Sequence, residues 1–210
     1  MSRPYALAIF DLDGTLVDSF PWFLTHVNGI ADRFGFRRIG ADEIEPLRRS
    51  GAREILNRLE VPTWKLPLIA RHVRRLKAAD VGTIPLFPGV DTMLQTLAER
   101  GVAVAMVSSD DERNVRRALG PENARRISHY DCGASLFGKA ARFKRVLRAA
   151  GIPAAEAIAI GDELRDLEAA RNAGIAFGAV SWGYASADAL RAAAPDEVFL
   201  AMEDISRRLA

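Results

Sequence analysis

Two aspartates stand directly after the first apolar run of the chain. The run Ala6–Phe10 leads into Asp11, and Asp13 follows two positions later, just before Gly14. Neighbouring carboxylates repel each other and raise each other's pKa, and a bound cation relieves that repulsion. The pair is therefore suited to a site that holds a cation, while a solvated turn uses the same residue types.

A second pair of acids follows another apolar run. After Ala157–Ile160 come Asp162 and Asp166, which are four residues apart and so share one face at the start of an expected helix. The helix dipole tolerates acids at that end. Capping alone explains one of them, but it does not explain why two strand ends each present two carboxylates. Hard oxygen ligands of this kind suit Mg²⁺ better than a soft metal.

Two serines and a lysine elsewhere in the chain could together bind an anion. Ser108 and Ser109 follow the apolar run Val102–Val107, and a serine with nearby backbone N–H groups can donate to a phosphate oxygen, although N-capping is an equal explanation. Lys139 comes after a glycine and before an expected helix. A solvated surface lysine is the alternative explanation for this residue.

These candidates need a scaffold that brings distant segments together. Short apolar runs alternate with helical spacing, which predicts βα units and a parallel sheet whose sites form at the carboxyl ends of the strands. Expected strands are Ala6–Phe10, Val102–Val107, Ile127–Tyr130, Ala157–Ile160, Ile175–Val180 and Glu197–Leu200, and expected helices are Val90–Arg100, Asn114–Leu119, Ala140–Ala150 and Leu164–Ala173. Residues 20–80 contain Arg-rich helical patterns and predict a helical insertion after the first strand.

Composition narrows the class of protein. The chain has 210 residues, with 29 Lys+Arg against 27 Asp+Glu, so its net charge of +2 is too small for a general nucleic-acid binder. The single cysteine, Cys132, excludes an intramolecular disulfide. No apolar run approaches about 18 residues, and the N-terminus lacks a signal-peptide pattern. We expect a soluble, cytoplasmic monomer or homodimer that has a small-molecule substrate and no nucleic-acid or membrane partner.

Taken together, these residues resemble the motifs of the haloacid dehalogenase superfamily, in its phosphoglycolate-phosphatase-like branch. Asp11–Ser19 is similar to the first motif at every position, and Gly161–Asp166 fits the fourth motif, Gly-Asp-x-x-x-Asp. Ser108 falls at the serine or threonine of the second motif, and Lys139 falls near the lysine of the third. Leu86–Val90 is similar to the stretch where the chain re-enters the core. The resemblance covers nearly the whole chain.

The resemblance implies an α/β fold with a Rossmann-like parallel-sheet core and a small inserted helical cap. The core would comprise residues 1–15 and 82–210, and the cap residues 16–81. It also implies Mg²⁺-dependent phosphoryl transfer through an aspartyl-phosphate. Asp11 would be the nucleophile, and Asp13 the general acid and base.

The other site residues take their implied roles from the same motifs. The metal would be held by Asp11, Asp13 (through its backbone carbonyl), Asp162 and Asp166. The phosphoryl group would be held by Ser108, Ser109 and Lys139. Lys144 is the rival for the lysine of the third motif, and we prefer Lys139 because Gly138 places it before the helix, whereas Lys144 lies within the helical pattern. In the cap, Arg53 lies where the family reads its substrate, and its guanidinium could bind a carboxylate or a second phosphate.

Hydrolysis of a small phosphomonoester is the leading expectation, with phosphoglycolate as a family-level guess. Asp13 favours phosphoryl transfer, because dehalogenases of the superfamily lack this second acid. Phosphonatases use a cap lysine as a Schiff base, and neither Lys65 nor Lys77 has a convincing context for that role. A phosphomutase of the same fold and a non-catalytic phosphate-binding or regulatory module are the alternatives.

Overall fold

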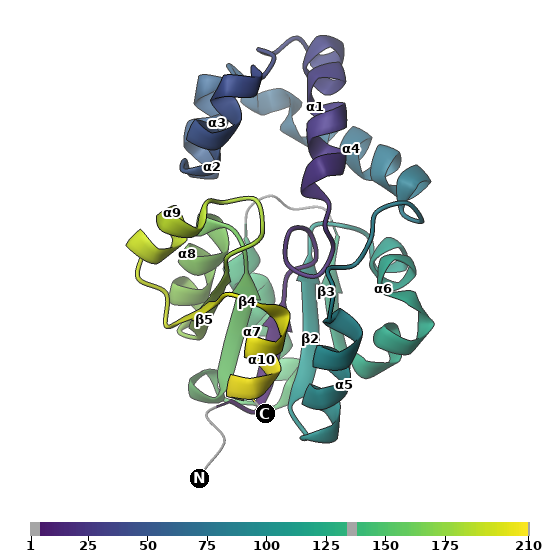
Figure 1. Ribbon diagram of the computed structural model, residues 1–210, viewed down its shortest axis with the longest axis vertical. Helices are drawn as coiled ribbons and strands as arrows, with labels where there is room; N and C mark the ends of the chain where they lie inside the picture. Colours follow the sequence, from purple (N-terminus) through teal and green to yellow (C-terminus); the bar gives the residue numbers. More distant parts are fainter. Residues whose placement is uncertain (1–4, 134–137, 210) are drawn as a thin grey trace.

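A parallel β-sheet forms the centre of the molecule. The computed structural model describes residues 5–133 and 138–209, and within them six strands pair in the order β3-β2-β1-β4-β5-β6 (Figure 1). The strands are β1 (Leu7–Phe10), β2 (Ala103–Ser108), β3 (His129–Cys132), β4 (Ala157–Gly161), β5 (Ala176–Val180) and β6 (Glu197–Phe199). The expected α/β fold with a parallel sheet is confirmed.

The order of the strands creates a crevice next to β1. The chain proceeds from β1 to β2 and β3 on one side, and then returns to place β4, β5 and β6 on the other side. Phe10, the last residue of β1, pairs with Ile160, and β4 ends one residue later at Gly161, so the two strands end within one residue of each other. Sheets of this kind bind ligands at the carboxyl ends of the strands where the order reverses. Asp11 and Asp162 are the residues that follow these two ends.

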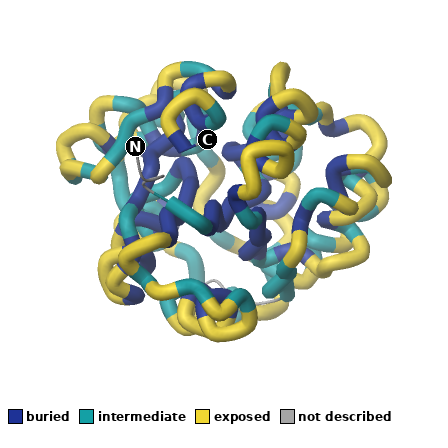
Figure 2. The backbone as a smooth tube through the Cα atoms, turned by 90° about the horizontal axis from the view of Figure 1, so that it is seen from below, coloured by how far each residue is buried: buried dark blue, intermediate teal, exposed yellow. Residues whose placement is uncertain are grey.

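Helices cover both faces of the sheet, as a parallel sheet requires. Side chains alternate along β1, so that Ala8 and Phe10 enter one hydrophobic cluster and Leu7 and Ile9 enter the other. The first cluster is completed by α5 (Val90–Glu99), α6 (Glu112–Arg126) and α10 (Met202–Leu209), and the second by α7 (Lys139–Ala150), α8 (Leu164–Ala173) and α9 (Ala187–Ala192). Buried stretches accordingly gather towards the middle of the molecule in Figure 2.

A helical segment lies between β1 and α5, beyond the carboxyl ends of the strands (Figure 1). It contains α1 (Phe20–Phe34), α2 (Ile44–Arg48), α3 (Ala52–Arg58) and α4 (Leu66–Asp80), together with short 3-10 turns at Ala41–Glu43 and Thr63–Lys65. Helix α1 ends at Gly35, which takes a left-handed conformation with φ 70°. The predicted helical insertion after the first strand is present.

In the part of the chain that the structure describes, no helix combines the length and the apolar character that crossing a bilayer would require.

Candidate active site

Three aspartates from distant parts of the chain meet at the carboxyl edge of the sheet. Asp11 follows β1, Asp162 follows β4, and Asp166 lies in the first turn of α8. One carboxylate oxygen of each lies within 4.8 Å of the others, and all three residues are buried. The two acid pairs found in the sequence thus contribute to one cluster, because the β1–β4 pairing aligns the ends of their strands.

The carboxylate of Asp162 is held from two loops. Thr15 donates from Oγ1 to Oδ1 over 2.8 Å, and the backbone N–H of Tyr184 donates to Oδ2 over 2.7 Å. Gly14, with φ +70°, leaves the space that this carboxylate needs, since a Cβ there would lie 2.2 Å from Oδ2 of Asp162. The glycine of the first motif is therefore required both by its backbone conformation and by close packing.

Lys139 is the cation of the acid cluster. It is the first residue of α7, and its Nζ lies 2.8 Å from Oδ2 of Asp11 and 2.7 Å from Oδ1 of Asp166. Gly138 precedes it with a left-handed φ of 95°, which turns the chain into the helix. Residues 135–137, which belong to the same stretch of sequence, lie outside the described residues.

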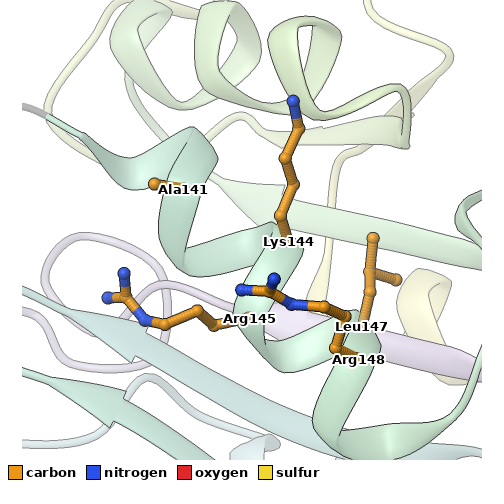
Figure 3. A pocket seen from close by; sticks show the side chains of 5 residues that line it. All are labelled: Ala141, Lys144, Arg145, Leu147 and Arg148. Atoms are coloured by element: carbon orange, nitrogen blue, oxygen red, sulfur yellow. The ribbon is translucent and has the colours of Figure 1, made fainter.

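Lys144, the rival lysine, lies elsewhere on α7. Its exposed side chain lines a hollow of about 490 Å³ together with Arg145 and Arg148 (Figure 3). None of the residues that line this hollow also lines the cavity at Asp11. The geometry therefore favours Lys139 over Lys144 as a partner of the acid cluster.

A cavity of about 340 Å³ opens at Asp11 and Lys139. Ser108 and Ser109 line it, and so does Arg53 from α3 of the helical segment. The charged residues of its lining are four cations and two acids: Arg53, Lys139, Arg142, Arg165, Asp11 and Glu168. An excess of positive charge in a concave site attracts anions.

Ser108 occupies the end of β2, beside the acid-bearing end of β1. It is buried, and its Oγ accepts a hydrogen bond of 3.1 Å from the backbone N–H of Asp110. The carbonyl oxygen of Ser108 accepts from Arg142 over 2.7 Å. Arg142 is thus engaged by the backbone, whereas the hydroxyl of Ser108 still has a proton to donate to a ligand.

Asp13 does not join the three-acid cluster through its side chain. The ammonium of Lys77, on α4, lies 2.5 Å from Oδ1 and 2.6 Å from Oδ2 of Asp13. The same nitrogen lies 2.6 Å from Oδ2 of Asp110. Burial lowers the pKa of Lys77, but the carboxylates of Asp13 and Asp110 raise it by more. The pKa therefore lies above its ordinary value, and this lysine stays charged.

The acids of the cluster differ in their protonation. Burial raises the pKa of Asp11, but Lys139 and Arg165 outweigh it and hold that pKa below its ordinary value. Burial, together with the neighbouring carboxylates of Glu163, Asp11 and Asp166, raises the pKa of Asp162 well above its ordinary value. Burial likewise raises the pKa of Asp166 to about 6, against the opposing effect of Lys139. Asp11 is thus the acid of the cluster that gives up its proton most readily.

The cluster fits a hard divalent cation. Oδ2 of Asp166 is buried and has no hydrogen-bond partner among the described residues. The raised pKa values of Asp162 and Asp166 indicate excess negative charge, which a cation would relieve. Oxygen ligands of this type are those that Mg²⁺ prefers. Asp11, Asp162 and Asp166 are therefore the side chains able to hold such an ion.

The sequence predicted no role for several residues that the structure brings to the site. Arg165 stands beside Asp166 within the fourth motif, and its Nε is buried without a hydrogen-bond partner among the described residues. Thr15 lies within the first motif, which is the signal that could have found it. Tyr184 follows β5 and belongs to none of the motifs. The sequence offers Lys77 only as a Schiff-base lysine without a convincing context, and nothing in it indicates the contact with Asp13.

Comparison with known proteins identifies relatives of this fold and sequence. A family model described as haloacid dehalogenase-like hydrolase matches residues 8–180. The chain is 32% identical over 189 residues to the phosphoglycolate phosphatase of Synechococcus elongatus, covering 90% of this chain and 89% of that protein. It is 30% identical to the phosphoglycolate phosphatase of Pseudomonas syringae pv. tomato, with coverages of 85% and 70%.

Solved structures share the fold. A haloacid dehalogenase-like hydrolase from Streptococcus pneumoniae superposes with a TM-score of 0.77 at 21% identity, covering 96% of this chain and 97% of that one. CbbY from Rhodobacter sphaeroides, solved in complex with phosphate, superposes with a TM-score of 0.72 at 20% identity, covering 96% of each chain. At these identities the likeness concerns the fold alone.

Proposed function

The chain belongs to the haloacid dehalogenase-like hydrolase family and is a phosphatase, and we propose that it cleaves small phosphomonoesters with Mg²⁺ through an aspartyl-phosphate on Asp11. One observation carries the proposal. The ionised carboxylate of Asp11 faces a cationic cavity, paired with Lys139 and flanked by two buried acids. A phosphate ester that enters this cavity would therefore lie beside a nucleophile and beside cations that offset its negative charge.

In the first step, an oxygen of Asp11 forms a bond to phosphorus while the bond between phosphorus and the alcohol oxygen breaks. Asp13 begins this step protonated, donates its proton to the departing oxygen and is left as a carboxylate. In the second step, Asp13 takes a proton from water as the water oxygen bonds to phosphorus and the bond to Asp11 breaks. The products are the alcohol and inorganic phosphate. The low pKa of Asp11 supports its role, because a carboxylate must be ionised to attack.

Positive groups around Asp11 would stabilise the transferring phosphoryl group. Lys139 and the hydroxyls of Ser108 and Ser109 would bind its oxygens, and Arg165 lines the same cavity. Mg²⁺ bound by Asp11, Asp162, Asp166 and the backbone carbonyl of Asp13 would supply further positive charge at those oxygens.

We assign residues 1–15 and 82–210 to the core and residues 16–81 to a cap over the site. Arg48 of the cap supports this assignment, since it donates to the carbonyl oxygens of Tyr184 and Gly183 over 2.9 Å each. The backbone N–H of Ser186 donates in turn to the carbonyl oxygen of Arg48 over 2.8 Å. A cap held in this way would exclude water while the phosphoryl group is transferred.

Arg53 would bind the part of the substrate that is not transferred. It lies on the cap and lines the cavity that Asp11 also lines. A guanidinium there suits a carboxylate or a second phosphate on the alcohol. Because the curated relatives are phosphoglycolate phosphatases, 2-phosphoglycolate is the first physiological ester to test.

Hydrolysis of p-nitrophenyl phosphate tests the proposal whichever ester is the physiological substrate. We expect the purified protein to release p-nitrophenolate with Mg²⁺, to lose this activity in EDTA, and to regain it when Mg²⁺ is restored. Asp11→Asn should be inactive with the metal present, and Asp162→Asn should need more Mg²⁺ or fail. Activity that survives EDTA, or that persists in Asp11→Asn, would overturn the mechanism.

A further inference from the structure

Helix α4 of the cap carries a buried lysine that none of the steps above uses. Lys77 is the buried residue of this helix, with 5% of its surface exposed, whereas the other residues of α4 are half-buried or exposed. A lone charge in such a position is costly unless it is paired and hydrogen-bonded. The contacts of Lys77 therefore have to offset the burial of its ammonium.

Those contacts run to two loops of the core. The ammonium lies 2.5 Å from Oδ1 and 2.6 Å from Oδ2 of Asp13, which belongs to the loop after β1. It also lies 2.6 Å from Oδ2 of Asp110, in the loop after β2. Lys77 thus ties the last helix of the cap to the proposed proton donor and to a second acid beside it.

The second acid is itself anchored to the site. Asp110 is buried, and its backbone N–H donates to Oγ of Ser108 over 3.1 Å. Asp110 therefore gives Lys77 a fixed partner on the core, next to a proposed phosphate-binding residue. Asp13, in contrast, keeps 30% of its side chain exposed, so it is held by Lys77 on one side and open on another.

We propose that Lys77 is a positioning residue that orients the protonated carboxyl group of Asp13 for proton transfer to the leaving group and stabilises the carboxylate that remains, with Asp110 as its anchor. This inference rests on the proposed function. Lys77 belongs to the cap and Asp13 to the core. Delivery of the proton therefore depends on the position of α4 relative to the loop that carries Asp13. A lysine that only stabilised the fold would affect all substrates alike.

Leaving-group dependence separates these two roles. p-Nitrophenolate departs without help from an acid, whereas the more basic phenolate of phenyl phosphate needs a proton. In Lys77→Met we expect kcat/KM for phenyl phosphate to fall at least about tenfold further than kcat/KM for p-nitrophenyl phosphate, since general acid catalysis contributes about 10²–10⁴-fold. Asp13→Asn should show the same signature.

Matched variants keep the test independent of folding. Lys77→Arg keeps the charge and should recover part of the selective loss, and Asp110→Asn, which leaves Lys77 in place, should give a smaller loss of the same kind. Lys65→Met is the control, because that cap lysine bonds to the carbonyl oxygen of Phe34, and it should leave the ratio of the two substrates unchanged.

The outcomes distinguish the inference from the function on which it rests. If the wild-type protein hydrolyses neither ester with Mg²⁺, the proposed function fails. If the wild-type protein is active, and Lys77→Met and Asp110→Asn lower both kcat/KM values equally, or leave them unchanged, only the positioning role of Lys77 is overturned. A greater loss on p-nitrophenyl phosphate than on phenyl phosphate would also overturn it.

Discussion

Lys139 places its ammonium 2.8 Å from Oδ2 of Asp11, and the same nitrogen lies 2.7 Å from Oδ1 of Asp166. Without a substrate, this lysine balances the charge of the two acids that flank it. In the proposed function, a phosphate ester bound at Asp11 would also come within reach of this ammonium. Lys139 would therefore serve both to hold the nucleophile and to stabilise the transferring group.

Removing this charge should reduce activity far more than removing the neighbouring lysine of the same helix. We expect Lys139→Met to lower kcat/KM for p-nitrophenyl phosphate by about a hundredfold or more, as losing one preorganised electrostatic partner typically does. Lys144→Met is the matched control, because Lys144 lines the separate hollow of Figure 3. Equal losses of kcat/KM in the two variants would contradict a specific role of Lys139 at the transferring phosphoryl group.

Asp166 should make the metal-free protein less stable as the pH rises. Its pKa is raised to about 6 in the folded protein, against about 3.9 in an unfolded chain, so the folded state holds this proton more tightly. Its contribution to the free energy of unfolding is therefore lost between about pH 4 and pH 6 and amounts to about 3 kcal/mol.

Asp166→Asn removes this dependence. At pH 7 without metal, we expect the variant to have a higher Tm than the wild-type protein, and at pH 4 the two values should converge. Thermal unfolding in EDTA across this range measures the difference directly. Mg²⁺ should raise the Tm of the wild-type protein but not that of Asp166→Asn, because a ligand stabilises only a state that binds it. A Tm difference that is constant with pH would refute the assignment.

Arg53 should matter for substrates that carry a second anionic group. A charged hydrogen bond contributes about 1.5–3 kcal/mol, so Arg53→Ala should lower kcat/KM for 2-phosphoglycolate about tenfold or more. The loss on p-nitrophenyl phosphate, which has no such group, should be small. Arg49→Ala is the control, since Arg49 is exposed on the same segment and does not line the cavity at Asp11. If Arg53→Ala lowers kcat/KM for both esters by the same factor, Arg53 does not bind the second anionic group of the substrate.

Substitution of Gly14 by alanine should destabilise the protein, whereas substitution of Gly29 by alanine should not. Alanine at Gly14 would meet Asp162 and would sit in a left-handed conformation that costs about 1–2 kcal/mol before any clash is counted. Gly29 lies within α1 with nothing within 4 Å of its added Cβ, so Gly29→Ala should raise stability by about 0.5–1 kcal/mol. Urea unfolding of both variants measures these changes in the free energy of unfolding. A Gly14→Ala variant as stable as the wild-type protein would contradict the prediction.

Most of the scaffold could be predicted from local patterns. The expected strands around Ala6–Phe10 and Ala157–Ile160 match β1 and β4, because strands buried on both faces form continuous apolar runs. β3 begins two residues later than the predicted Ile127–Tyr130, at His129. It is an edge strand of half-buried residues, so an apolar run was a poor guide to it.

The contacts between distant segments could not be predicted in the same way. The motifs indicated that Asp11 and Asp162 would meet, and the pairing of β1 with β4 brings them together. Lys77 lies in a basic helical pattern, where a lysine normally faces solvent, and its burial depends on two core loops far away in the sequence. Helix α10 was also missed, although Met202, Ile205 and Leu209 have helical spacing and are buried.

Trapping the covalent intermediate tests the central claim most directly. The wild-type protein, quenched in acid during turnover of p-nitrophenyl phosphate with Mg²⁺, would be digested and mapped by mass spectrometry. We predict that one phosphoryl group is found on the peptide that carries Asp11, at that residue, and that Asp11→Asn carries none. A phosphoryl group on another residue, or continued turnover by Asp11→Asn, would contradict the claim that Asp11 is the nucleophile.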